Sequence, residues 1–187
     1  MATGPRRAQA VFTTTLDLLA ARGFDGLTIE GVAERCGVNK TTIYRWWPSK
    51  AALVGAALTE GVELDLDVPD TGGLRGDLEA LVRTLVALLT EPPASDVALA
   101  ALGAAVRNPE LAEHARAFFA DRLARERAVF DRAVARGELE PDADPMLLVD
   151  LLAGAVWVRV AFRGLPVEDG FDRRAVAIVL DGAAARR

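Results

Sequence analysis

The chain of 187 residues has one cysteine, Cys36, and one histidine, His114. A single cysteine excludes a disulfide within the chain and is typical of a reducing compartment. Ser49 and Ser95 are the only serines, so very few residues could form a nucleophilic triad. The HExxH, CxxC and phosphate-loop motifs are absent. The sequence therefore predicts a protein that is not an enzyme and holds no metal or cofactor. Cys36 is interpreted as a small packing residue, with a redox sensor as the alternative.

Long uncharged apolar runs are missing too. The closest, residues 145–164, contains Asp150 and Arg159, so we expect no membrane-spanning helix and no membrane partner. The N-terminus has Arg6 and Arg7 but no apolar run before a small-residue cleavage site, so no signal peptide is predicted. These absences favour a cytoplasmic protein.

Negative charge predominates, since 22 Lys and Arg residues stand against 27 Asp and Glu residues. The excess is uneven along the chain. Residues 1–50 hold seven basic and four acidic residues, a net charge of +3, whereas the remainder carries −8. A basic N-terminal quarter on an acidic body favours a head that binds a polyanion. The alternative is an uneven surface charge without a partner.

Helical periodicity predominates and no convincing strand alternation appears, so the sequence predicts an all-α fold of about nine helices. The predicted helices cover residues 7–22, 29–36, 40–47, 51–58, 74–90, 95–107, 109–136, 145–163 and 169–184. Segment 63–73, ELDLDVPDTGG, combines acids, Pro69 and two glycines and is interpreted as a linker, although ELDLDV would also suit a short strand. We therefore expect domains at 1–58 and 74–187, joined through 59–73.

Two short helices joined by Gly-Val-Asn at residues 37–39 indicate a helix-turn-helix. Thr28, Asn39 and Ser49 are predicted to cap the helices that follow them. Gly37 can adopt a left-handed backbone without Cβ strain, and a sharp turn requires that conformation.

The second of these helices is basic, and we expect its outer face to contact DNA. Lysine and arginine can pair with guanine edges, and threonine methyl groups can contact thymine. Tyr44 and the indole of Trp46 can donate hydrogen bonds to phosphates, as can Lys50 at the start of the next helix. Trp47, four residues after Ile43, is expected to pack inward. The predicted DNA-binding residues are Thr28, Asn39, Lys40, Thr41, Thr42, Tyr44, Arg45, Trp46 and Lys50. The alternative is a small helical hairpin with a solvated charged face.

These residues resemble the tetracycline-repressor (TetR) family of bacterial transcription regulators. The resembling segment, residues 10–58, includes LLAARGFDGLTIEGVAERCGVNKTTIYRWWPSKAAL, with an aromatic-ended recognition helix followed by Pro-Ser-Lys. Two residues depart from the family pattern. Trp46 stands where histidine is most frequent, so a phosphate contact there would use the indole edge. Thr41 stands where glycine is common, which gives a bulkier groove surface.

The stretch RGELEPDADPMLLVDLLAGAVWVRVAFRGLPVEDGF, residues 136–171, resembles an actinobacterial-type C-terminal domain of that family. The resemblance implies that the last two long helices pair with their copies in a second subunit as a four-helix interface. It also implies that the other C-terminal helices enclose a pocket for a small-molecule effector. Effector binding would move the DNA-binding heads apart and release the operator. Domain 74–187 is then the effector-binding and dimerisation domain.

The residues themselves support a dimer in part. Helix 145–163 is apolar nearly all round, so it must be covered on several sides, and residues 175–180 form one apolar stripe. The predicted interface residues are Val156, Val160, Val176, Val179 and Leu180. A central core helix explains the same pattern. In a dimer, two recognition helices roughly 34 Å apart would read a palindromic site.

The effector pocket is the part that the sequence determines least. Its candidate lining residues are His114, Phe118, Asp150 and Trp157, with Arg159 as a further polar group. Each has an alternative: a phenylalanine at this spacing is commonly core, and His114 suits the surface of a charged helix. Asp150 and Arg159 equally suit surface or interface charges.

The sequence therefore predicts a bacterial TetR-type regulator, a repressor in the family's usual mode. It would bind double-stranded operator DNA as a homodimer and be released by an unknown small molecule. The alternative is a helical protein-interaction module without sequence-specific DNA binding. Salt separates the two, because phosphate contacts release counterions and DNA affinity then falls steeply as salt rises.

Overall fold

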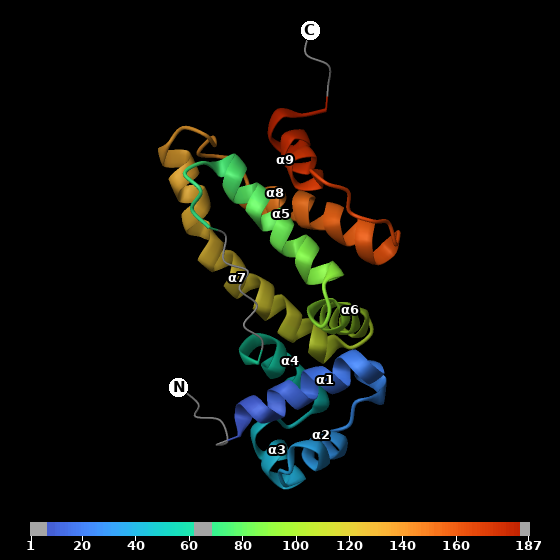
Figure 1. The fold of residues 1–187 in the computed structure, drawn as a ribbon. Coiled ribbons are helices and arrows are strands. Elements are labelled where there is room, and N and C mark those ends of the chain that lie inside the picture. The colour runs from blue at the N-terminus through green and yellow to red at the C-terminus, as the bar shows by residue number, and fades with distance from the viewer. Residues whose placement is uncertain (1–6, 62–68, 184–187) are drawn as a thin grey trace. The chain divides into compact units, whose positions relative to one another are not determined.

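The computed structural model describes residues 7–61 and 69–183, apart from the side chains of Phe119 and residues 121–126. Every regular element in those ranges is helical, with nine α-helices and one π-helical segment, so the prediction of an all-α fold is confirmed. The elements, in chain order, are α1 (Ala8–Gly26), α2 (Ile29–Cys36), α3 (Lys40–Trp46), α4 (Lys50–Glu60), α5 (Leu74–Thr90), α6 (Ala94–Ala105), α7 (Pro109–Ala135), α8 (Pro145–Trp157), η1 (Val158–Phe162) and α9 (Phe171–Asp181) (Figure 1). The ambiguous ELDLDV segment lies outside the described residues.

Two compact units make up the described chain. The first contains α1–α4, α6 and the first part of α7, and the second contains α5, the rest of α7, α8, η1 and α9. Each unit therefore combines stretches that are not consecutive in the chain, and α7 contributes to both units. The predicted division of the sequence at residues 59–73 stays a prediction.

The first unit is built around α1, which packs against α2, α4 and α6. Phe12 of α1 meets Trp47 edge to face, with ring centroids 5.2 Å apart. Trp47 is buried, as predicted, and Ile43 of α3 is fully buried. Each such side chain contributes about 2 kcal/mol to folding. These anchors hold the short helix α3 in the unit, since seven residues have little helical stability of their own. Cys36 is also buried, as expected of a packing residue.

Gly23 interrupts α1 near the end that the sequence predicts. Its φ of 68° is not helical, and one further turn runs from there to Gly26. The predicted end at residue 22 is therefore a kink, because only glycine adopts this backbone without strain. Gly37 likewise takes the left-handed conformation, with φ 65° and ψ 36°.

In the second unit, the helix predicted at 145–163 divides into α8 and the π-helical segment η1. The Arg163 N–H donates to the carbonyl of Val158, five residues back, at 2.9 Å. By length and composition alone, Pro145–Phe162 could cross a membrane, with a mean hydropathy of 1.7, and 11% of it is buried. This differs from the expectation that Asp150 and Arg159 exclude such a helix. A helix that is apolar nearly all round and so little covered needs an apolar neighbour.

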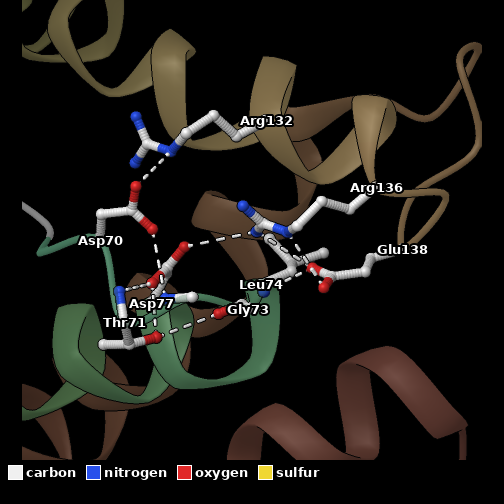
Figure 2. A network of polar contacts seen from close by, with 9 residues as sticks. Asp70, Thr71, Gly73, Leu74, Asp77, Arg132, Arg136 and Glu138 are labelled. Carbon is white, nitrogen blue, oxygen red and sulfur yellow. Dashed lines mark hydrogen bonds and ion pairs between the residues drawn. The ribbon is translucent and has the colours of Figure 1, made fainter.

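The N-terminus of α5 is held by side chains far along the chain (Figure 2). Gly73 precedes the helix and has no side chain to cap it. Glu138 accepts the Leu74 N–H through Oε2 at 2.7 Å, and its Oε1 lies 3.0 Å from Arg136 Nε. The hydrogen bond from Arg136, followed by that from Leu74, lowers the pKa of Glu138 below its ordinary value of 4.5.

Asp77 lies in the first turn of α5 and is fully buried. Its Oδ1 accepts the Thr71 N–H at 2.7 Å and the Thr71 hydroxyl at 2.6 Å, while Oδ2 lies 3.9 Å from Arg136 Nη2. Arg132 Nε lies 3.1 Å from Asp70 Oδ2. A buried carboxylate is tolerated only with such partners. The network therefore joins the start of α5 to the end of α7 within the second unit.

Candidate nucleic-acid interface

The turn between α2 and α3 has the geometry of a glycine-terminated helix. The Val38 N–H donates to the carbonyl of Ala33 at 3.0 Å, and the Gly37 N–H donates to that of Glu34 at 3.3 Å. These bonds satisfy carbonyls that a helix end leaves open, and they require the left-handed backbone of Gly37. Residues 37–39 then connect α2 to α3.

All three predicted helix caps are confirmed. Thr28 Oγ1 accepts the Gly31 N–H at 3.1 Å, and Asn39 Oδ1 accepts the Thr41 N–H at 2.9 Å. Ser49 Oγ accepts the Ala52 N–H at 2.9 Å. Each cap contributes about 1 kcal/mol. They fix where α2, α3 and α4 begin, and hence which residues of α3 point outward.

The outer face of α3 is open to solvent. Ile43 is the buried residue of this helix, and Thr42 is half-buried. The exposed predicted DNA-binding residues here are Asn39, Lys40, Thr41, Tyr44, Arg45 and Trp46. The two rings protrude, with Tyr44 43% and Trp46 38% exposed. The structure thus brings six predicted residues together on one accessible surface.

Two cations on this surface are already oriented. Lys40 Nζ lies 3.6 Å from Glu30 Oε1, and Arg45 Cζ lies 5.9 Å from the centroid of the Trp46 ring. Lys40 and Glu30 are both more than half exposed, so their attraction is worth about 0–1 kcal/mol at most. A phosphate or a base edge can therefore replace Glu30 at little cost.

Lys50, predicted as a phosphate ligand, has a partner within the chain. Its Nζ donates to the carbonyl of Phe24 at 2.6 Å and lies 4.3 Å from the centroid of the Phe24 ring. The side chain thus satisfies a carbonyl near the end of α1. An ammonium has three donors, so this bond leaves others for a phosphate. Its phosphate role, like that of the exposed Thr28, stays a prediction.

Sequence reasoning missed Arg7. Its Nη1 lies 3.4 Å from the carbonyl oxygen of Gly37, which places a further cation beside the turn before α3. The only sequence signal was a basic residue at the start of the first helix. The tertiary fold brings residues 7 and 37 together, and no local sequence motif marks their contact.

The predicted pocket residues fall in different units. His114 and Phe118 belong to the first unit, and Asp150 and Trp157 belong to the second. Asp150 is exposed, whereas the other three are partly buried. A groove of about 440 Å³ lies between α8 and α9, and its lining includes Arg159 but none of these four residues.

Two of the predicted interface residues are placed wrongly for a surface role. Val156 and Val176 are fully buried within the chain, so they have no area left for another subunit. Val160, Val179 and Leu180 are partly buried. The exposed apolar side chains of these elements are Leu147, Leu151, Val158, Phe162 and Ile178, between 49% and 75% exposed. The sequence pattern could not tell the buried side chains of α8 from the exposed ones, because this helix is apolar nearly all round. An interface formed by α8 and α9 stays a prediction.

A capped two-helix unit with a left-handed glycine in its turn and a cationic, solvent-facing second helix defines a helix-turn-helix DNA-binding protein. Residues 11–57 match the family model of bacterial regulatory proteins of the tetR family, and residues 68–179 match that of the tetracyclin repressor-like C-terminal domain. The chain therefore belongs to the TetR family of transcriptional regulators, as its resemblance implied.

Full-length relatives agree with this assignment. The chain is 36% identical to the DNA-binding transcriptional repressor TetR of Mycobacteroides abscessus, over 96% of this chain and 95% of that protein. It is 32% identical to the uncharacterized HTH-type transcriptional regulator YdeS of Bacillus subtilis, over 95% and 89%. The crystal structure of the TetR family transcription regulator SCO0332 aligns with a TM-score of 0.77 at 37% identity, covering 96% of this chain and 98% of that one.

Proposed function

We propose that the protein is a cytoplasmic repressor that binds a palindromic operator as a homodimer through α3. The observation that carries the proposal is the exposed outer face of α3, where Lys40, Thr41, Tyr44, Arg45 and Trp46 surround a fully buried Ile43. A relative 36% identical to this chain is a DNA-binding transcriptional repressor. Repression follows if the operator overlaps a promoter.

In this proposal the residues of α3 divide into two groups. Lys40 and Arg45 pair with guanine edges, and the threonine methyl groups of Thr41 and Thr42 contact thymine. Tyr44 and Trp46 donate to phosphates, with Thr28, Asn39 and Lys50 contributing to the backbone contacts. Phosphate contacts position the head, and base contacts select the sequence.

The dimer is proposed on the exposed face of α8, η1 and α9. Leu151 and Ile178 are 52% and 58% exposed, and Phe162 is 75% exposed. Apolar side chains gathered in this way on a water-facing surface are typical of an interaction site. A second copy that covers them would also cover the groove between α8 and α9, since Leu151 and Ile178 line it.

The effector is proposed to be a small molecule bound by the C-terminal domain, with Asp150 and Trp157 of the second unit as candidate contacts. Trp157 offers apolar surface, and Asp150 a charge, which are the groups that ligand pockets combine. Titration of the DNA complex with the substrates of neighbouring gene products tests this. Release of DNA by one compound, lost in Trp157→Ala, supports it, and retention of release in both Trp157→Ala and Asp150→Ala contradicts it.

A fluorescence titration against duplex DNA from the promoter adjacent to the protein's own gene tests the DNA-binding role. The logarithm of the association constant should fall linearly with the logarithm of the salt concentration. Arg45→Ala should weaken binding about tenfold or more and relax the sequence preference. The matched control is Arg107→Ala, since Arg107 is also exposed and forms an ion pair with the exposed Asp25 at 3.5 Å. Equal binding by wild type and Arg45→Ala would reject the assigned face.

The second candidate function, a helical protein-interaction module, makes the opposite prediction. Such a protein would bind no duplex even at low salt. The titration of the wild-type protein alone therefore distinguishes the two functions. The matched family models favour DNA binding.

A further inference from the structure

Helix α4 contains a glycine in its interior at a place where glycine is costly. Gly55 is buried, and a helix-interior glycine is about 1 kcal/mol less favourable than alanine. A Cβ at this position would lie 2.8 Å from both Cβ and Cδ2 of His114, closer than real carbon contacts. The imidazole of His114, on α7, therefore occupies the space that any larger residue would need.

A second contact joins the same two helices at the start of α4. Ser49 Oγ donates to Glu110 Oε1 at 2.5 Å while it accepts the Ala52 N–H at 2.9 Å. Glu110 and His114 are four residues apart, so they share one face of α7. Between them, Leu111 is 1% exposed and belongs to the core of the first unit. This face of α7 therefore contacts α4 at two places, the cap and the middle of the helix.

The position of α4 matters for DNA because of where α4 begins. Only Trp47 and Pro48 separate the end of α3 from Ser49, and Trp47 is buried. Lys50 is bonded to the carbonyl of Phe24, so the start of α4 is held from α1 as well. A shift of α4 against this core would carry the end of α3 with it.

We propose that Glu110 and His114 are positioning residues for DNA binding, which hold α4 at Ser49 and Gly55 and thereby fix the recognition helix α3. Neither residue belongs to the exposed surface of α3, so both act through α4. This rests on the proposed operator binding by α3. None of the assigned DNA contacts changes in the variants below, so their effect on DNA is transmitted.

The contact at Gly55 allows a test by compensation. Gly55→Ala inserts a methyl group against the imidazole, and His114→Ala removes the imidazole. In titrations of the full chain against its own promoter duplex, we expect Gly55→Ala to weaken binding about tenfold, as overpacking shifts helices. His114→Ala alone leaves an empty space beside Gly55 and should weaken binding. The double variant should bind within about twofold of wild type, because the methyl group at residue 55 then takes up part of the space that the imidazole filled. Gly103→Ala is the control, since nothing lies within 4 Å of a Cβ there.

The contact at Ser49 is tested by a graded pair. Glu110→Ala removes the acceptor of the Ser49 hydroxyl and should weaken DNA binding, whereas Glu110→Gln retains an acceptor oxygen and should restore it. Glu113→Ala is the control, because Glu113 is exposed and pairs with Arg116. The slope of affinity against salt should equal that of wild type in all these variants, because no phosphate contact is lost.

Two further measurements distinguish a positioning role from a loss of protein stability and from an absence of DNA binding. Each variant is titrated at a temperature below the midpoint of its thermal unfolding, so that a loss of affinity reflects the folded protein. Because His114 is the only histidine in the sequence, its two ring C–H signals are assigned without ambiguity, and Gly55→Ala should shift them whereas Gly103→Ala should not. If wild type binds and all variants bind equally, the positioning role is rejected alone. If wild type binds no duplex, the proposed function is rejected, and the positioning role with it.

Discussion

Gly37 occupies the turn between α2 and α3 with φ 65° and ψ 36°. A β-branched residue reaches this conformation only with strain, so Gly37→Val should lower the free energy of unfolding by about 1 kcal/mol or more. Urea unfolding followed by circular dichroism measures the change. Gly103→Ala is expected to be neutral or stabilising, because Gly103 lies in α6 and has no positive φ. Equal midpoints for Gly37→Val and wild type would contradict the account of the turn.

The carboxylate of Glu138 is expected to make the stability of the protein depend on pH. Its pKa is lowered in the folded protein by the Arg136 hydrogen bond and then by the Leu74 N–H. The stabilisation it contributes is therefore present above the ordinary value of 4.5 and is lost as pH falls through the lower folded value. Thermal unfolding between pH 6 and about pH 3 should show a smaller acid destabilisation for Glu138→Gln than for wild type. The exposed Glu140→Gln should behave as wild type, and identical pH profiles for all three would remove the role of Glu138.

At the scale of elements, α8 depends on a cap at its start. Asp144 Oδ1 accepts the Met146 N–H at 2.9 Å and the Leu147 N–H at 3.3 Å, and Pro145 occupies the first helical position. Asp144→Ala should lower the free energy of unfolding by about 1 kcal/mol. The nearby exposed Asp142→Ala is the matched control. A urea midpoint equal to that of the control would show that the cap contributes nothing.

Local signals predicted the elements well, and long-range contacts account for what was missed. The caps at Thr28, Asn39 and Ser49 depend on neighbours within three residues, so the sequence contains the whole interaction. The contact between Gly55 and His114 joins residues 59 apart, and no local pattern marks it. His114 was accordingly assigned to a pocket or to the surface. The burial of Val156 in α8 was not predicted for another reason, because periodicity cannot orient a helix that is apolar nearly all round.

At the scale of the whole molecule, the exposed apolar face predicts the oligomeric state. Val158→Asp places a charge on η1, where Val158 is 49% exposed. A buried, unpaired charge opposes association, so the variant should sediment as a monomer and bind the promoter duplex more weakly than wild type. The same substitution at Val106, which is 80% exposed in the other unit, is the control. A dimeric Val158→Asp variant would place the subunit contact elsewhere.

The burial of Cys36 gives the native sequence a practical property. With Sγ turned toward the Ala33 carbonyl and 8% of the residue exposed, this thiol is shielded from water-borne reagents. A cysteine introduced at Thr41, which is exposed, would then be the sole thiol to react quickly with a maleimide dye. One fluorophore per subunit can thus be attached to the recognition helix while Cys36 is kept.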